Sequence, residues 1–240
     1  MRICAVRPIG AVVFIVLFTR CQPVRAQSSN VRGEPPPAFP RVGAARVLEN
    51  EWGTVWDVTW APGSATPMHR HAFDYVGVEL ADSTFNTVTP DGQRRTLTAK
   101  AGASWFLQRG VTHIEEVPSG SPARHAVVID LKDAAVPSFV NSSGLPIAFA
   151  EGVAAKVDEN QRVVRWDYTW PTGENAPTRF YGKNAFIIFV DGGELTSSVT
   201  GRGPQSLLVS AGQVLFRPGG SALSERSTKG NVRGIIIELK

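Results

Sequence analysis

The chain has 240 residues, of which 25 are Lys or Arg and 21 are Asp or Glu. This length suffices for one large domain or two small ones, each with an adequate core. Four of the basic residues and none of the acidic ones lie in the first 26 positions, which leaves 21 of each in the remainder. The balance excludes a strongly basic face, so we expect neither nucleic acid nor an anionic membrane surface as a partner.

The first 26 residues have the pattern of a cleavable secretory signal. Arg2 and Arg7 precede an apolar run, Ile9 to Phe18, which is about ten residues long and too short to cross a bilayer as a helix. Val24 and Ala26 stand at the two positions where a signal peptidase requires small side chains. We therefore predict a signal peptide at 1–26, a periplasmic or secreted protein, and no stable membrane insertion after cleavage.

Both cysteines of the chain, Cys4 and Cys21, lie in this segment. Lipidation of Cys21 is an alternative to cleavage, but Thr19-Arg20 before it fits a lipidation site poorly. After cleavage the chain would contain no thiol and no disulfide, so packing must stabilise it.

The segment after the signal differs in composition from the rest. Residues 27–43 contain Glu34 followed by three prolines and few large apolar groups, which predicts a flexible or extended arm. From residue 44 onward, short runs rich in Val, Ile, Phe and Trp alternate with Gly, Pro, Asp and Asn clusters. Such runs at spacings of about ten residues predict an all-β sandwich or barrel.

An internal repeat displaced by 110 positions divides the chain. AARVLEN, which begins at Ala44, returns as AAKVDEN at Ala154, and WDVTWAPG at Trp56 returns as WDYTWPTG at Trp166. Near the end the offset slips by two, so that VVIDLK matches IIIELK. The repeat predicts two copies of one β-domain. The predicted boundaries are 44–132 for the first copy, 133–153 for the linker and 154–240 for the second copy.

Three histidines of the first copy have a spacing that suits a metal ion. His69 and His71 stand one residue apart, so on a strand they share a face. Glycines at 102 and 110 permit a tight turn that returns His113 to the pair. Imidazole suits iron, nickel, copper and zinc, and must be neutral to bind, so affinity is expected to fall below about pH 6.5.

The spacings resemble the two signature motifs of the cupin superfamily, G-x5-H-x-H followed by an acidic residue, and G-x5-P-x-G-x2-H. The first motif begins here at Gly63 and the second at Gly102. The proline of the second motif is Gln108 in the first copy but Pro218 in the second.

The resemblance covers residues 44–240 and implies an all-β chain of two tandem cupin-type jelly-roll barrels. It also implies one divalent transition-metal ion (Fe, Mn, Ni, Cu or Zn) bound by His69, His71 and His113.

Three acidic or imidazole side chains are further candidates. The family usually places a Glu six or seven positions after the first histidine, whereas here Asp74 lies at five. Asp74 would need a β-bulge to join the histidines as a ligand or as their hydrogen-bond partner, and is otherwise a solvated turn residue. Glu115 and His125 are candidate catalytic proton carriers, with a rim position of His125 as its alternative.

The second copy lacks every candidate ligand. Arg179, Tyr181, Asn184 and Leu223 replace His69, His71, Asp74 and His113. Neither arginine nor leucine can coordinate a metal, so we expect no metal there. The second copy is interpreted as a structural partner, with an anionic or sugar-like ligand at Arg179 and Tyr181 as the alternative.

The resemblance implies an exported metal-dependent enzyme, dioxygenase-like, acting on a small organic molecule in the first barrel. Isomerisation or hydrolysis is the alternative chemistry. A non-catalytic module that binds metal or ligand for sensing, storage or scaffolding, and a purely structural pair of barrels, remain alternatives because one scaffold hosts many activities. A monomer and a homodimer paired through edge strands both remain open.

Overall fold

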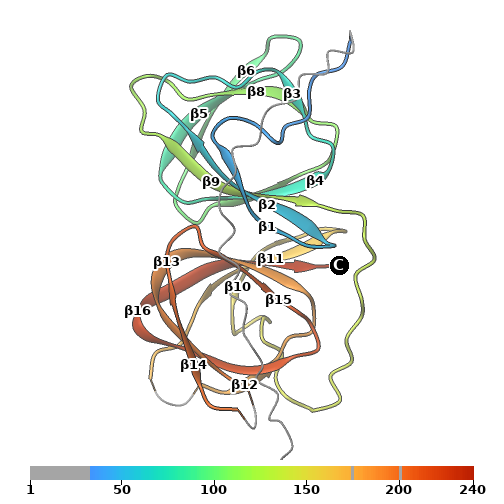
Figure 1. Cartoon of the computed structure of the whole chain (residues 1–240), viewed down its shortest axis with the longest axis vertical. Helices are drawn as coiled ribbons and strands as arrows, with labels where there is room; N and C mark the ends of the chain where they lie inside the picture. Colours follow the sequence, from blue (N-terminus) through green and yellow to red (C-terminus); the bar gives the residue numbers. More distant parts are fainter. Residues whose placement is uncertain (1–32, 174–175, 200–201) are drawn as a thin grey trace, which may run out of the picture.

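The computed structural model describes residues 33–173, 176–199 and 202–240. The predicted signal peptide, with Cys4, Cys21 and the Ala26 cleavage site, lies outside these ranges. No helix in the described ranges is both long enough and apolar enough to cross a membrane. The described chain is built of strands, which confirms the all-β prediction (Figure 1).

The strands fall into two barrels, one above the other in Figure 1. The strands of the first barrel are β1 (Ala44–Glu49), β2 (Gly53–Trp60), β3 (His69–Arg70), β4 (Asp74–Glu79), β5 (Ser83–Val88), β6 (Arg94–Ala99), β7 (Ser104–Leu107), β8 (Thr112–Glu116) and β9 (Arg124–Leu131). The strands of the second barrel are β10 (Ala155–Glu159), β11 (Val163–Thr169), β12 (Thr178–Phe180), β13 (Ala185–Ser198), β14 (Gln205–Val209), β15 (Val214–Arg217) and β16 (Ala222–Leu239).

Both barrels use one pairing scheme. The first contains a sheet of order β1-β2-β9-β4-β7 and a second sheet of order β3-β8-β5-β6. In the second barrel the long strand β13 corresponds to β4 and β5 together, and the long strand β16 corresponds to β8 and β9 together. The two sheets are therefore joined into one, with the order β10-β11-β16-β13-β14. Even a register shift recurs, between Arg46 and Leu48 and between Lys156 and Asp158.

The barrels pack against each other through an apolar joint. Strands β2, β4 and β9 are apolar on both faces, because one face lines their own barrel and the other contacts the second barrel. The buried joint residues are Val55, Val76, Val78, Val127, Ile129 and Leu131 from the first barrel, and Val163, Phe186, Ile188, Val190, Ile235, Ile237 and Leu239 from the second.

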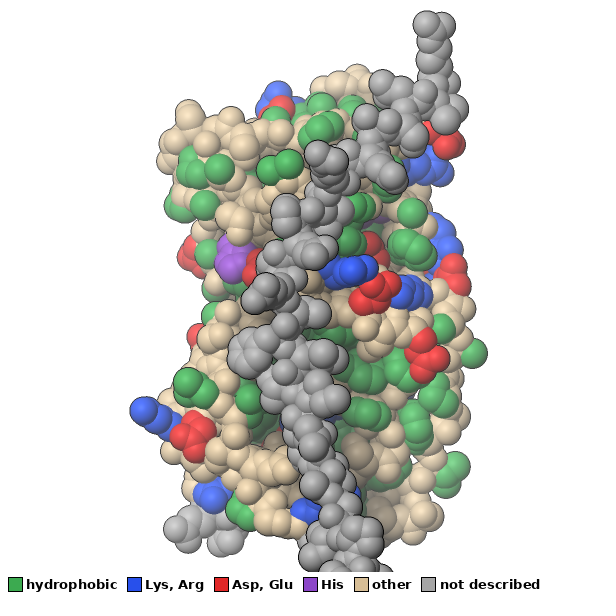
Figure 2. All heavy atoms as spheres, in the orientation of Figure 1, with side chains coloured by type: hydrophobic (Ala, Val, Ile, Leu, Met, Phe, Trp, Pro, Cys, Tyr) green, Lys and Arg blue, Asp and Glu red, His purple; other side chains and the backbone are tan. Residues whose placement is uncertain are grey.

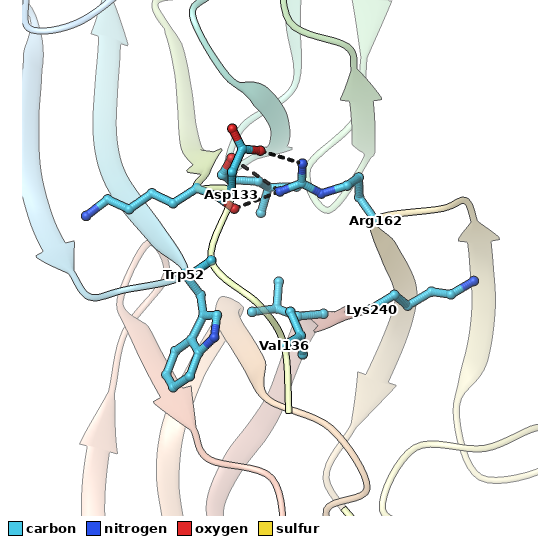
Figure 3. Close-up of a pocket in the computed structure, with 9 residues that line it drawn as sticks. Trp52, Asp133, Val136, Arg162 and Lys240 are labelled. Atoms are coloured by element: carbon cyan, nitrogen blue, oxygen red, sulfur yellow. Dashed lines mark hydrogen bonds and ion pairs between the residues drawn. The ribbon is translucent and has the colours of Figure 1, made fainter. Parts of the chain in front are cut away.

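A small cavity of about 120 Å³ lies at the edge of the joint. Figure 3 shows Trp52 and Asp133 on one side of it and Arg162 and Lys240 on the other, with Arg162 bonded to Asp133. On the visible part of the face in Figure 2, basic and acidic side chains lie next to one another.

The structural repeat begins earlier than the sequence repeat that we aligned. Arg70 N donates to Pro36 O, and Ala38 N donates to Arg70 O. The same two bonds recur 110 positions later, from Phe180 N to Pro146 O and from Ala148 N to Phe180 O. The segment 36–41, which we name the N-terminal strap, therefore packs on the first barrel as the end of the predicted linker packs on the second.

Candidate metal centre

The three predicted histidines converge inside the first barrel. His69 and His113 are direct partners across strands β3 and β8, and His71 follows β3. Their ring centroids lie 4.7 to 5.3 Å apart. One nitrogen from each lies within 4.8 Å of the other two, and all three residues are buried. The arrangement therefore offers three imidazole nitrogens to one ion, as the spacing predicted.

The hydrogen bonds around the rings leave the inward nitrogens free. His69 Nδ1 is 2.9 Å from the carbonyl oxygen of Pro67, which fixes Nδ1 as the protonated nitrogen and leaves the Nε2 lone pair available. The Nε2 atoms of His69, His71 and His113 are buried, and none has a hydrogen-bond partner among the described residues. Buried polar atoms are rarely left unpaired, so this triad fits a bound ion.

Burial also keeps these imidazoles neutral. It lowers the pKa of His71 to about 3, with further lowering by His113 and His69. Burial lowers the pKa of His113 to about 4, although the Glu115 charge acts in the opposite direction. The pKa of His69 is lowered as well, again mainly by burial. Neutral imidazole is the metal-binding form, so the folded chain holds its ligands ready at neutral pH.

Tyr75 fixes the orientation of the His71 ring. The Tyr75 and His71 rings stack with centroids 3.6 Å apart and planes 2° from parallel. The Tyr75 hydroxyl is buried without a partner among the described residues, and burial raises its pKa far above the ordinary value. Tyr75 therefore stays protonated at neutral pH and can donate a hydrogen bond into the barrel.

The structure does not bring Asp74 to the histidines. Strand β4 pairs with β7 and β9 without a register shift, so the bulge that Asp74 would need is absent from these pairings. Its carboxylate instead accepts hydrogen bonds from Arg109 and Arg162. Burial would raise the Asp74 pKa, but the bonds from Arg109 outweigh this effect and the pKa is lowered. Asp74 is thus neither near the imidazoles nor a solvated turn residue.

Glu115 lies beside the histidines but is fully engaged by arginines. Its Oε1 accepts from Arg124 Nη1 at 2.7 Å, and its Oε2 accepts from Arg41 Nη2 at 2.9 Å. Burial would raise its pKa, but Arg124 and Arg41 overcome that effect and hold the pKa well below the usual range. Glu115 is therefore a permanent anion that positions two guanidinium groups, and at neutral pH it has no proton to donate.

His125 lies outside the cavity. Its Nε2 is 2.6 Å from Asp57 Oδ1, and its side chain is 38% exposed. The same face of β9 carries Val127 and Ile129, which belong to the joint between the barrels. The face that His125 shares points to the second barrel and away from the metal centre, so His125 is half-exposed at the edge of the barrel and does not line the cavity.

Two arginines of the site were missed by reasoning from sequence. Arg124 is 1% exposed, bonds both Glu79 and Glu115, and lies 4.3 Å from the Trp60 ring and 3.6 Å from the Phe85 ring. Arg41 reaches the site from the N-terminal strap, which we expected to be a flexible or extended arm. The signal that was available is the pair Ala38-Phe39, which recurs as Ala148-Phe149 at the offset of the repeat.

A cavity of about 560 Å³ opens beside the histidines. His71 and His113 line it, together with Tyr75, Glu115 and Arg41. Most of the surface that its wall exposes is apolar, although charged and hydroxyl-bearing side chains also line it. The large apolar side chains in the wall are Phe39, Trp60, Phe85, Leu97, Trp105, Leu107, Val111 and Val128. The size and lining suit a small organic molecule.

The second barrel has a filled interior at the equivalent place. The corresponding cavity measures about 10 Å³. Tyr181, in the position of His71, donates its hydroxyl hydrogen to Glu225, which corresponds to Glu115. Leu223 packs against the apolar core, and Asn184 accepts a bond from the Gly219 backbone. The described residues of this barrel place no histidine near the site and leave almost no space for a ligand.

No model of a known protein family matches the chain. Over 80 residues the chain is 40% identical to the Beta-alanine degradation protein BauB of Pseudomonas aeruginosa, a match that covers 32% of the chain and 77% of BauB.

Among solved structures, AerE from Microcystis aeruginosa has a TM-score of 0.59 at 14% identity, with 86% of the chain and 97% of AerE covered. The oxalate decarboxylase of Lactobacillus farciminis, in a formate complex, has a TM-score of 0.57 at 13% identity, covering 90% of the chain and 87% of that structure. A cupin 2 conserved barrel domain protein from Leptotrichia buccalis has a TM-score of 0.51 at 14% identity, covering 82% and 88%. At these identities the likeness shows the fold.

Proposed function

Because this chain has the all-β fold of cupin proteins and a buried triad of histidines, we propose that its first barrel binds one divalent transition-metal ion and acts there as an enzyme on a small organic molecule. The observation that carries the proposal is the buried triad of His69, His71 and His113, whose three Nε2 atoms lack any partner among the described residues. The cavity of about 560 Å³ beside the triad provides room for a substrate.

The reaction class that we propose is oxygenation. A bound metal of this kind supplies a Lewis acid and, where the ion is redox-active, a centre for electron transfer. The chain supplies the positioning: the Pro67 carbonyl sets the tautomer of His69, and the Tyr75 ring sets the plane of His71. The apolar wall excludes water from the site, which strengthens polar interactions with a ligand.

The second barrel is proposed as a structural partner. It covers the apolar outer face of β2, β4 and β9, which would otherwise expose six buried aliphatic side chains. Its own interior is filled by Tyr181 and Trp170, which both bond Glu225.

Metal content tests the binding part of the proposal. Protein reconstituted in turn with Fe, Mn, Ni, Cu and Zn should hold about one equivalent of at least one of them by elemental analysis. His71→Ala and His113→Ala should each lower that content sharply. The matched control is Tyr181→Phe in the second barrel, which should leave it unchanged. Less than about a tenth of an equivalent with every metal would refute both binding and catalysis.

Oxygen uptake tests the catalytic part. The metal-loaded protein should consume oxygen with at least one member of a panel of phenols, diketones, thiols and carboxylates, and His113→Ala should not. One equivalent of metal without turnover of any panel member would favour the alternative, a module that binds metal or ligand for sensing, storage or scaffolding.

We also propose export, on the basis of the sequence pattern of residues 1–26. Expression of the full chain in a bacterium should give a periplasmic or secreted protein whose N-terminus, by Edman sequencing, lies near Gln27. A replacement of Val12 and Val13 by Asp should block cleavage and retain the protein in the cytoplasm. Cytoplasmic accumulation of the unaltered chain with Met1 intact would contradict export.

A further inference from the structure

We propose that the ligand of the first-barrel cavity is a small carboxylate with an apolar or aromatic body, and that Arg41 of the N-terminal strap binds its carboxylate group. This inference names the substrate class of the proposed enzyme and rests on that proposed function.

The first ground is an unused donor. Arg41 donates a hydrogen bond from Nη2 to Glu115, while its Nη1 is buried and has no partner among the described residues. Arginine remains charged in proteins, and a buried guanidinium N–H without an acceptor is costly. Because Arg41 lines the cavity, the acceptor that it lacks can come from a molecule inside it.

Two more donors point to the same kind of ligand. The indole Nε1 of Trp60 and the hydroxyl of Tyr75 are buried, unpaired within the described residues, and part of residues that line the same cavity. Three unsatisfied donors around one space call for a ligand with several acceptor oxygens. A carboxylate has two oxygens and accepts from a guanidinium with high strength.

The charge of the wall agrees with an anion. The lining residues include four arginines and two glutamates, and no lysine or aspartate. The arginines are Arg41, Arg94, Arg95 and Arg124, and the glutamates are Glu79 and Glu115. A neutral triad of histidines adds no negative charge to this balance. Glu116, just outside the lining, pairs with Arg94, so the remaining excess is one positive charge. An excess of this sign favours an anionic ligand over a cationic one.

The repeat provides an internal comparison. At the offset of 110, Arg41 corresponds to Glu151, and at the offset of the last strand Arg124 corresponds to Val232. Glu115 and Glu225 are the same in both copies. In the second barrel Arg217 bonds Glu225 in place of these arginines, so a guanidinium on this glutamate belongs to both barrels. A strap arginine, Arg41, occurs only in the barrel that has the histidines and the open cavity, as expected if it serves a ligand there.

Binding to metal-free protein tests the proposal separately from the metal. The probes are pairs of an aryl-alkyl carboxylate and its neutral amide, such as 3-phenylpropanoate and 3-phenylpropanamide, titrated into chelator-treated full-length protein by calorimetry. The carboxylate should bind at least about tenfold more tightly than the amide. Equal affinities, or no carboxylate binding up to about 10 mM, would overturn the proposal.

Variants locate the preference. Arg41→Gln should remove the preference for the carboxylate, and Arg41→Lys, which keeps the charge without the forked donors, should keep part of it. Arg46→Gln makes the same charge change at an exposed site and should leave it intact. A preference that survives in folded Arg41→Gln protein would overturn the role of Arg41. If Arg41→Gln does not fold, the preference for the carboxylate over the amide is compared between the unaltered protein and Arg41→Lys. An undiminished preference in Arg41→Lys would then overturn the role of Arg41.

The two proposals can fail independently. Protein that holds one equivalent of metal but binds acid and amide equally loses only the carboxylate proposal. Protein that prefers carboxylates but binds no metal loses the metal site and the catalysis, and keeps Arg41 as part of a carboxylate-binding site.

Discussion

Arg162 of the second barrel donates a hydrogen bond from Nη1 to Asp74 Oδ2 of the first barrel over 2.8 Å. The same nitrogen bonds Asp133, as Figure 3 shows, and Arg109 bonds both carboxylates. Asp74 therefore belongs to a charged network at the joint between the barrels, and its two oxygens face arginines and not imidazoles.

Asp74→Asn should lower the free energy of unfolding by about 1–3 kcal/mol, because charged hydrogen bonds to two guanidinium groups are weakened. Metal content should stay at the value of the unaltered protein. Denaturant unfolding measures the first quantity and elemental analysis the second. In a double-mutant cycle, the loss in the Asp74→Asn/Arg162→Gln variant should be smaller than the sum of the losses in the two single variants. Loss of metal from a folded Asp74→Asn protein would mean that Asp74 does contact the ion.

The histidine pKa values predict how metal-free protein responds to acid. The pKa is about 3 for His71 and about 4 for His113 in the folded chain, against about 6.5 when unfolded. Between these values the unfolded chain binds more protons than the folded one, so stability falls as pH drops from about 6.5 to about 4. Each histidine contributes up to about 1.4 kcal/mol per pH unit in that window.

A double variant isolates this effect. Burial raises the Asp130 pKa to about 6, which makes the folded chain hold an extra proton and opposes the histidine effect. His71→Gln/His113→Gln retains Asp130 but loses the imidazoles, so its stability should fall less steeply from pH 6.5 to 4. Urea unfolding at each pH gives the free energy of unfolding. An equal dependence of that free energy on pH in the two proteins would contradict the lowered pKa values. Because burial lowers the pKa of all three histidines, metal affinity is expected to fall at a lower pH than the 6.5 of a free imidazole.

The metal triad could be predicted because it depends on local rules. The shared face of His69 and His71 needs only the two-residue period of a strand. His113 lies on another strand, β8, and could be assigned because its spacing from Gly102 and Gly110 matches the second motif. The repeat supplied the rest, since the second copy shows that the fold stands without these residues. The same local rule placed Asp74 on the opposite face of an ideal strand, and Asp74 stayed a candidate only through a β-bulge that the structure lacks. Its partner Arg162 lies 88 positions away, and no local pattern indicates it.

The faces of the strands could not be predicted because both are apolar. On β9, His125 alternates with Ala126 in an unbroken strand, and the sequence alone does not say which set faces the interior. The joint with the second barrel removes the polar outer face that would have marked the difference. Arg124 was missed for a related reason: an arginine at the start of a strand is usually solvated, and its buried partners Glu79 and Glu115 come from other strands.

Arg124→Gln should be among the most damaging substitutions in the chain. It leaves Glu79 buried without its cation and removes one of two cations from Glu115, so we expect a loss of about 3–5 kcal/mol in the free energy of unfolding. Arg46→Gln breaks an exposed pair with Glu49 and should cost less than about 1 kcal/mol. Thermal and denaturant unfolding of both variants checks this. A similarly small loss of unfolding free energy in both variants would show that Arg124 does not stabilise the buried charges of Glu79 and Glu115.

Phe39 and Phe149 allow a matched test of the N-terminal strap. The Phe39 ring stacks on Trp56 at 4.9 Å, and its edge faces His71 at 6.2 Å. Phe149 occupies the same place in the second barrel, against Tyr168 and Tyr181. Each ring is buried, so Phe39→Ala and Phe149→Ala should each cost about 3–5 kcal/mol in unfolding free energy.

The two variants should differ in ligand binding. Phe39→Ala enlarges the first-barrel cavity and loosens the segment that carries Arg41, so carboxylate affinity in calorimetry should fall by about tenfold or more. Phe149→Ala alters only the filled barrel, so its carboxylate affinity should match that of the unaltered protein. If both variants lose stability but both keep full affinity, the strap stabilises the barrel without forming part of the ligand site. If both lose affinity equally, the loss reports general destabilisation and not the wall that Phe39 provides.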